Sequence, residues 1–121
     1  FVPVVSTTFA SLGNMFSKLP PESLGWLMID EAGQAVPQSA VGGLLRAKRA
    51  VVVGDPLQIE PVLTSPPELI DYLMQSKLQE KSEKWDPCMW SVQTLADRVN
   101  PYGCMIDMDG EEQWIGIPLW V

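Results

Sequence analysis

Two short apolar runs, each followed by carboxylates, constrain the fold of this chain more than any other feature. The first is Trp26–Ile29, which ends at Asp30 and Glu31; the second is Ala50–Val53, which leads to Asp55. Continuous apolar runs of this length, bounded by turn-forming residues, are typical of strands buried in a parallel sheet. Between them lies a segment with Pro near its start and basic residues at its end, which is typical of a helix. The alternation predicts an α/β domain with a mainly parallel sheet.

The remaining segments are assigned from the same signals of periodicity and turn composition. We expect strands at 1–5, 23–29 and 49–55, and helices at 37–48, 67–79 and 88–99. Polar residues after the first strand predict a strand end that leads into a loop. Toward the end of the chain, two short strands around an Asp-Gly turn precede a last apolar segment, 117–121.

Charge and residue usage exclude several functional classes. The 121 residues carry a net charge of −7, and residues 63–121 hold ten of the 15 acidic groups. Such an acidic chain binds nucleic acid weakly by itself, since that affinity depends on cationic groups that meet phosphates. The chain has no histidine and only two cysteines, Cys88 and Cys104, which excludes a Cys/His zinc site and a His-based catalytic triad.

The ends of the chain and its apolar runs bear on location and completeness. No charged-then-apolar signal opens the sequence, and no apolar run approaches the roughly 20 residues that a membrane-spanning helix needs. We therefore expect a cytoplasmic protein with free thiols and no membrane association. Because the chain begins at Phe1 inside an apolar run, we also expect it to be a fragment of a larger domain.

The carboxylates at the strand ends form the candidate site. In open α/β sheets, ligands bind beyond the carboxyl ends of the strands. If the two runs are neighbouring strands, Asp30, Glu31, Asp55 and Gln58 surround one crevice. Such carboxylates suit a hydrated Mg²⁺, and one beside the metal can hold the attacking water of a phosphoryl transfer. Taken singly, an Asp-Glu or Gly-Asp step is better explained as a helix cap or a turn.

The combination of the two acidic boxes is more specific than either alone. "IDEAGQA" and, further along, "VVVGDPLQIEPV" resemble helicase motifs II and III of superfamily 1, in the branch of the RNA-surveillance helicases and their bacterial relatives. Upstream, "VVSTTFASL" resembles the family's segment that contacts the nucleic acid strand. "SVQTLADRVNPYG" and "WIGIPLWV" resemble the stretch that precedes the second motor domain in bacterial members.

The resemblance implies a fold and a division of the chain. The fold is a partial RecA-like (P-loop NTPase) domain with a mainly parallel sheet, truncated at both ends. Residues 1–63 would form the core of this motor domain, with the Walker B-type and motif III boxes. Residues 64–121 would form the rest of the domain and the connection toward a second motor domain that the chain lacks.

The resemblance also implies a role for each residue of the nucleotide site. Asp30 would hold Mg²⁺ through water, and Glu31 would orient and polarise the water that attacks the γ-phosphate. Gln58 would sense the γ-phosphate and link the nucleotide state to the nucleic acid strand. Asp55 would support the same network, and Gln34 would join it. The cofactors implied for the parent protein are ATP and Mg²⁺.

A separate group of hydroxyls is implicated in contact with the nucleic acid. By the same resemblance, Thr7, Thr8 and Ser11 would lie near the backbone of single-stranded DNA or RNA. Hydroxyl groups can contact phosphate without selecting a sequence. The implied activity is coupling of ATP hydrolysis to translocation on, or unwinding of, nucleic acid.

The chain departs from the family pattern in one important respect. A phosphate-binding loop of the form G-x-x-x-x-G-K-[ST] does not occur in the sequence, nor does the arginine finger of a second motor domain. Without these groups, electrostatic stabilisation of the transition state is largely lost. We therefore expect the isolated chain to bind no cofactor, to hydrolyse ATP negligibly and to self-associate through exposed apolar edges.

Two other functions remain open at this level. One is a non-catalytic interaction or regulatory module that keeps a helicase-like sheet. The other is an unrelated Mg²⁺-dependent phosphohydrolase built on the same carboxylates, although this reading leaves the box that carries Gln58 unexplained.

Overall fold

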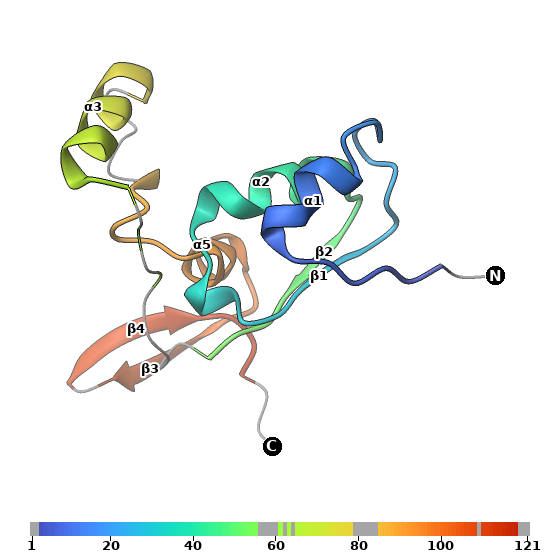
Figure 1. Cartoon of the computed structure of the whole chain (residues 1–121). Helices are drawn as coiled ribbons and strands as arrows, with labels where there is room; N and C mark the ends of the chain where they lie inside the picture. The colour runs from blue at the N-terminus through green and yellow to red at the C-terminus, as the bar shows by residue number, and fades with distance from the viewer. Residues whose placement is uncertain are drawn as a thin grey trace.

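The computed structural model describes residues 3–55, 61, 63, 65–78, 85–108 and 110–118. Short helices and strands follow one another along the chain (Figure 1). The elements are α1 (Phe9–Met15), β1 (Leu27–Ile29), the 3₁₀ helix η1 (Ala32–Gln34), α2 (Pro37–Arg46), β2 (Ala50–Val52), α3 (Pro67–Lys77), α5 (Val92–Val99), β3 (Cys104–Met108) and β4 (Glu111–Ile115).

The two strands with acidic ends are neighbours in a parallel sheet. Ile29 pairs with Val52, and the amide of Val53 donates to the carbonyl oxygen of Ile29 at 2.8 Å. Beyond the last paired residues, the amide of Ala32 donates to the carbonyl oxygen of Val53 at 3.0 Å. Parallel pairing brings the carboxyl ends of both strands to the same edge. This confirms the predicted α/β class and is consistent with a partial RecA-like domain.

One face of this sheet is covered by the helices α1 and α2, as Figure 1 shows. Gly43 of α2 lets the side chains of Leu12 and Leu27 approach closely, since a Cβ there would lie 3.2 Å and 3.1 Å from their methyl carbons. The apolar core of the domain is small. It consists of Ile29, Ala32, Ala35, Ala40 and Val92, with Phe9, Leu27 and Val52 packed against it.

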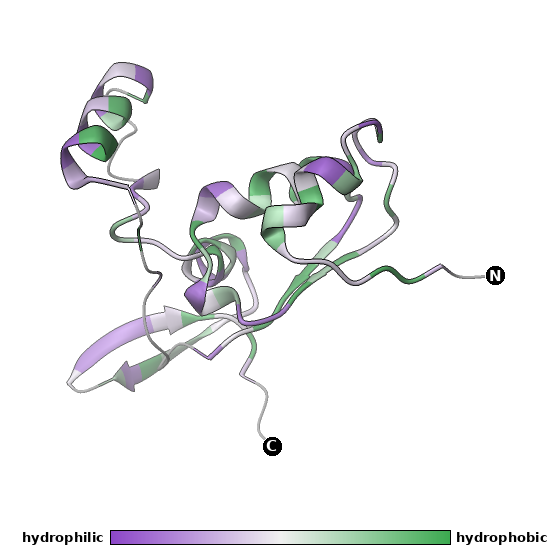
Figure 2. Ribbon diagram, viewed as in Figure 1, coloured by the Kyte–Doolittle hydropathy of each residue, from purple (hydrophilic) through white to green (hydrophobic). Residues whose placement is uncertain are grey.

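The opposite face of the sheet is open to solvent. Met28 is 77 % exposed and Val51 is 37 % exposed, although both lie in the apolar runs that Figure 2 shows along β1 and β2. The expectation that both apolar runs form strands buried within a sheet is therefore wrong for this face in the described part of the chain. An apolar run indicates that a strand can be buried, but burial of both faces requires elements packed on each side of the sheet.

The described part of the first predicted strand, residues 3–5, does not form a strand. Residues 3–8 have no regular structure, and Val4 is 88 % exposed. The polar stretch that we expected to be a strand end and loop contains α1 instead. Phe9 and Leu12 stand three residues apart, which places both on the helix face that packs against the core. A β-branched run forms a strand only where a partner strand pairs with it.

The predicted helix 88–99 is shorter than expected and begins at Val92, after a capping box. The hydroxyl of buried Ser91 accepts from the amide of Thr94 at 3.1 Å, while the amide of Ser91 donates to the hydroxyl of Thr94 at 2.8 Å. This reciprocal arrangement satisfies amides that the first turn of a helix leaves unpaired. The helices predicted at 37–48 and 67–79 are confirmed as α2 and α3, each slightly shorter.

The last part of the chain forms the predicted hairpin. β3 and β4 pair antiparallel, with Cys104 opposite Ile115, and the turn holds Gly110 at a φ of +91°. Asp97 of α5 ties the hairpin to the domain. The indole nitrogen of Trp114 donates to the backbone oxygen of Asp97 at 3.1 Å, and the amide of Gly116 donates to the carboxylate of Asp97 at 2.9 Å. Within the described ranges, no helix is long and apolar enough to cross a membrane.

Candidate functional site

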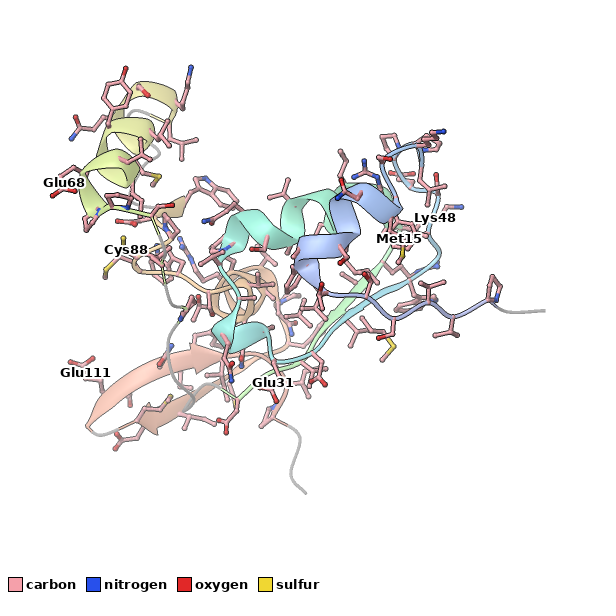
Figure 3. The ribbon with its side chains drawn as sticks, in the orientation of Figure 1. Met15, Glu31, Lys48, Glu68, Cys88 and Glu111 are labelled. Carbon is pink, nitrogen blue, oxygen red and sulfur yellow. The ribbon has the colours of Figure 1, made fainter. Side chains whose placement is uncertain are left out.

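Three of the predicted acidic residues lie at one edge of the parallel sheet. Asp30 and Glu31 follow β1 directly, and Asp55 follows β2 after Val53 and Gly54. All three carboxylate side chains are exposed. Figure 3 shows Glu31 at this end of the sheet. The shared edge follows from the parallel register, so Asp30, Glu31 and Asp55 lie at the same end of the two strands.

The turn after β1 holds Glu31 in an unusual backbone conformation. Its φ of 54° and ψ of 38° lie in the left-handed region, which disfavours an L-residue by about 1–2 kcal/mol. The amide of Glu31 donates to Oδ1 of Asp30 at 3.0 Å, which helps to hold this turn. Backbone strain of this kind concentrates at functional sites, where the surrounding structure enforces it. The turn directs the chain from the strand into η1 within two residues, Asp30 and Glu31.

The small residues beside the carboxylates let the two loops touch. Ala32 is fully buried. A Cβ on Gly54 would lie 2.9 Å from the amide nitrogen of Gly33, and a Cβ on Gly33 would lie 3.1 Å from the carbonyl oxygen of Asp55. Both contacts are with backbone atoms, which cannot swing away as side chains do. This approach therefore requires the Gly before Asp55 and leaves little space beside Gly33.

A third element, α5, contacts the two loops of the site. The side-chain amide nitrogen of Gln93 donates to the carbonyl oxygen of Gly54 at 3.1 Å. The amide of Val92 donates to the carbonyl oxygen of Ala35, just after η1, at 2.9 Å. From sequence, this segment was expected to be a helix and to resemble the stretch before a second motor domain, and its contact with the site was missed. No residue pattern near Gln93 signals this contact.

A cavity of about 210 Å³ lies where α5 meets the two loops. Its lining combines backbone, polar and apolar groups. The lining residues are Gly33, Asp55, Pro61, Cys88, Met89, Trp90, Ser91, Gln93, Thr94 and Gln113.

The pKa of the Cys88 thiol, one of the lining groups, is raised by desolvation and by its neighbour Asp86. The thiol is therefore protonated at neutral pH and is a poor nucleophile.

The acidic residues suit a Mg²⁺ ion that is held mainly through water. No group of three or more acidic or cysteine side chains in the described part of the chain could hold a metal ion directly. Mg²⁺ usually keeps several waters and is bound through one or two carboxylates together with substrate phosphates. Asp30 uses Oδ1 for the amide of Glu31 and is exposed, so its other oxygen is available to a metal-bound water.

The other predicted site residues are the two glutamines and the three hydroxyl residues near α1. Gln34 ends η1 and is exposed, close in the chain to the acidic turn. Gln58 lies outside the described residues. Thr7, Thr8 and Ser11 gather where α1 begins. The hydroxyl of Thr8 donates to that of Ser11 at 3.3 Å, and the hydroxyl of Thr7 reaches the carbonyl oxygen of Thr8 at 3.5 Å.

Comparison with known proteins identifies the family. No curated protein and no solved structure gives a significant match to the chain. The sequence model of one family, described as an AAA domain, matches residues 2–66, which is more than half of the 121 residues. The match includes both acidic boxes and the start of α1. Domains of this family are found in superfamily 1 helicases and are associated with ATPase activity. The chain thus belongs to this AAA domain family.

Proposed function

We propose that the chain supplies the carboxylate half of the nucleotide site in an ATP-dependent helicase of superfamily 1. One observation carries the proposal. Asp30, Glu31 and Asp55 follow adjacent parallel strands whose register places them at one edge. Residues 1–63 would then be the core of the motor domain, and residues 64–121 the rest of the same domain. The parent protein would couple ATP hydrolysis to movement along, or unwinding of, nucleic acid.

In this proposal the two acidic residues after β1 have different tasks. Asp30 holds a hydrated Mg²⁺ through water, and the ion, when bound, offsets the charge of the nucleotide phosphates. Glu31 orients the attacking water and accepts its proton. Its strained turn supports this role, because it holds the backbone of Glu31 in one conformation at the strand end.

The second box would report the state of the nucleotide. We assign Gln58 to sensing the γ-phosphate, since a neutral amide can hydrogen-bond a phosphate oxygen without adding charge. Asp55 and Gln34 would complete the network around it. Direct contact between the loops at Gly33 and Gly54 supports this assignment. Because their backbones touch, movement of one loop displaces the other.

The hydroxyls at the start of α1 would meet the nucleic acid. Thr7, Thr8 and Ser11 form one polar cluster, and hydroxyl groups suit contacts with phosphate that do not read a sequence. We propose single-stranded DNA or RNA as the partner of the parent protein. The net charge of −7 means that cationic groups outside this chain must supply most of the affinity.

The proposed site needs groups that the chain does not contain. No Gly-Lys-Ser/Thr sequence occurs among the 121 residues. We therefore propose that the phosphate-binding loop and an arginine finger come from polypeptide outside this chain, and that the chain alone is inactive. Its exposed apolar sheet face would favour self-association when the chain is isolated.

The test compares ATP hydrolysis by this chain with that by the natural protein that contains it, with and without single-stranded nucleic acid. The isolated chain should show no turnover above its Glu31→Gln variant. The natural protein should show stimulated turnover, which Glu31→Gln lowers by about 100-fold or more. Glu22→Gln is the matched control, because Glu22 also has a left-handed backbone, at φ 58°, and is exposed elsewhere.

A second candidate is a non-catalytic regulatory module that keeps the helicase-like sheet. The absence of a Gly-Lys-Ser/Thr sequence from the chain favours it. The same assay separates the two. A natural protein that binds nucleic acid but hydrolyses no ATP, or whose turnover is indifferent to Glu31→Gln, would overturn the motor proposal and leave the regulatory one.

A further inference from the structure

Helix α5 contacts both loops that carry the acidic residues. Gln93 reaches the loop after β2 through the hydrogen bond from Nε2 to the carbonyl oxygen of Gly54, at 3.1 Å. One residue earlier, the amide of Val92 binds the carbonyl oxygen of Ala35 beyond η1, at 2.9 Å. The start of α5 thus bridges segments that are far apart in the sequence. These α5 residues lie outside the region, 2–66, that defines the family match.

The side-chain oxygen of the Gln93 amide is buried without a hydrogen-bond partner in the described part of the chain. Among the described residues, Oε1 of Gln93 is the buried side-chain atom that has no hydrogen-bond partner. It occupies the space that a Cβ on Gly54 would need, and it would lie 3.2 Å from a Cβ on Gly33. The amide group therefore fills the gap between the two glycines at the base of the site.

Stability alone does not explain a glutamine at this position. A buried acceptor without a partner destabilises the folded state, and this loss offsets the gain from the Nε2 hydrogen bond. Methionine has a similar length and volume and would fill the same space without a polar atom to satisfy. What methionine cannot do is bind the carbonyl oxygen of Gly54. The feature that glutamine supplies here and methionine does not is a directional link between α5 and the loop of Asp55.

We propose that Gln93 is a positioning residue that holds the loop after β2 against the turn after β1. By fixing the carbonyl of Gly54 beside Gly33, it sets the relative placement of the carboxylates of Asp55 and Glu31. Displacements of about 1 Å in such groups can lower a reaction rate by about 100-fold. The catalytic consequence rests on the function proposed above, whereas the structural consequence can be measured in this chain directly.

The first test is hydrogen exchange of backbone amides in the chain with Gln93→Met. The amide of Ala32, bonded to Val53 at the site end of the sheet, should exchange at least tenfold faster than in the wild type. The amide of Leu27, bonded to Arg49 at the other end at 2.9 Å, should be unchanged. Gln93→Ala provides the same comparison in a second variant. Equal acceleration at both amides, or none at Ala32, overturns the proposal.

The second test is ATP turnover by the natural protein that contains the chain. Gln93→Met should lower kcat at least tenfold while KM for ATP stays within twofold, and the melting temperature should not fall. Gln75→Met, at an exposed position of α3, is the matched control and should change neither. An active wild-type protein whose kcat is insensitive to Gln93→Met overturns the positioning role. An inactive wild-type protein overturns the motor proposal, and the exchange experiment then decides on Gln93.

Discussion

The side-chain amide of Gln93 donates a hydrogen bond to the carbonyl oxygen of Gly54 across 39 positions of sequence, at 3.1 Å. This contact joins α5 to the loop that carries Asp55. It also explains why position 54 must be glycine, since Oε1 of Gln93 and the amides of Ala32 and Gly33 fill the space beside it. The site is therefore built from three segments, of which sequence analysis identified two.

Gly54→Ala should destabilise the chain by about 1–3 kcal/mol, because the new methyl group has to displace backbone as well as Gln93. Urea denaturation measures this change. Combining it with Gln93→Ala should recover part of the loss, but not all, because the two amide nitrogens remain at 2.9 Å and 3.0 Å. Gly13→Ala is the control. It lies in α1 with no atom near its added Cβ, and helix propensity predicts a gain of about 0.5–1 kcal/mol.

The left-handed backbone of Glu31 predicts a difference between two substitutions that both remove its carboxylate. Glu31→Gly should be more stable than Glu31→Ala by about 1 kcal/mol, because only glycine adopts the φ of 54° without strain. Thermal unfolding of the two variants tests this. The same pair at Glu22, with φ 58°, should show a similar difference. If alanine is as stable as glycine at both positions, the left-handed turns are not those of the folded protein.

From the capping box of α5, we expect Ser91 to stabilise the helix that contacts the site. Ser91→Ala should lower the free energy of unfolding by about 1 kcal/mol, since the amide of Thr94 loses its acceptor in a buried position. Ser76→Ala is the control. Ser76 is exposed on α3, and its removal should change stability by less than about 0.5 kcal/mol. Equal effects at the two positions would contradict the capping role.

From the raised pKa of Asp97, we expect the stability of the fold to depend on pH. Partial burial raises the pKa of its carboxyl above the ordinary 3.8, although the amide of Gly116 acts in the opposite direction. A raised pKa in the folded state means that folding favours the protonated acid. The contribution of Asp97 to stability is therefore greatest below pH 3.8 and is lost as the pH rises through its folded-state pKa.

Asp97→Asn should accordingly raise the melting temperature at pH 7, and the gain should shrink as the pH falls toward 3.8. Asparagine keeps an oxygen that can accept from the amide of Gly116, whereas Asp97→Ala removes it and should be less stable than Asp97→Asn at every pH. Melting curves across this pH range provide the measurement. A gain from asparagine that is constant with pH would contradict the role of the carboxyl charge.

Sequence alone was a good guide to the elements with strong local signals. The apolar runs before Asp30 and Asp55 correctly predicted two neighbouring parallel strands, although the strands are shorter than expected. Proline at the start of α2 and the Asp-Gly turn between β3 and β4 correctly located a helix and a hairpin. The start of the chain was misassigned, because β propensity at Val4 and Val5 depends on a partner strand that residues 3–8 do not find.

The sequence by itself was enough to predict the carboxylates of the candidate site, because the two acidic boxes are read from residue type and local order. It also determined that Asp30 and Asp55 share an edge, because parallel strands bring their carboxyl ends together. Only the tertiary structure decided what holds these loops in place. The left-handed turn of Glu31, beside the hydrogen bond from its amide to Asp30, is not indicated by the spacing of apolar residues. The link from Gln93 to Gly54 joins segments distant in sequence, which no local periodicity encodes.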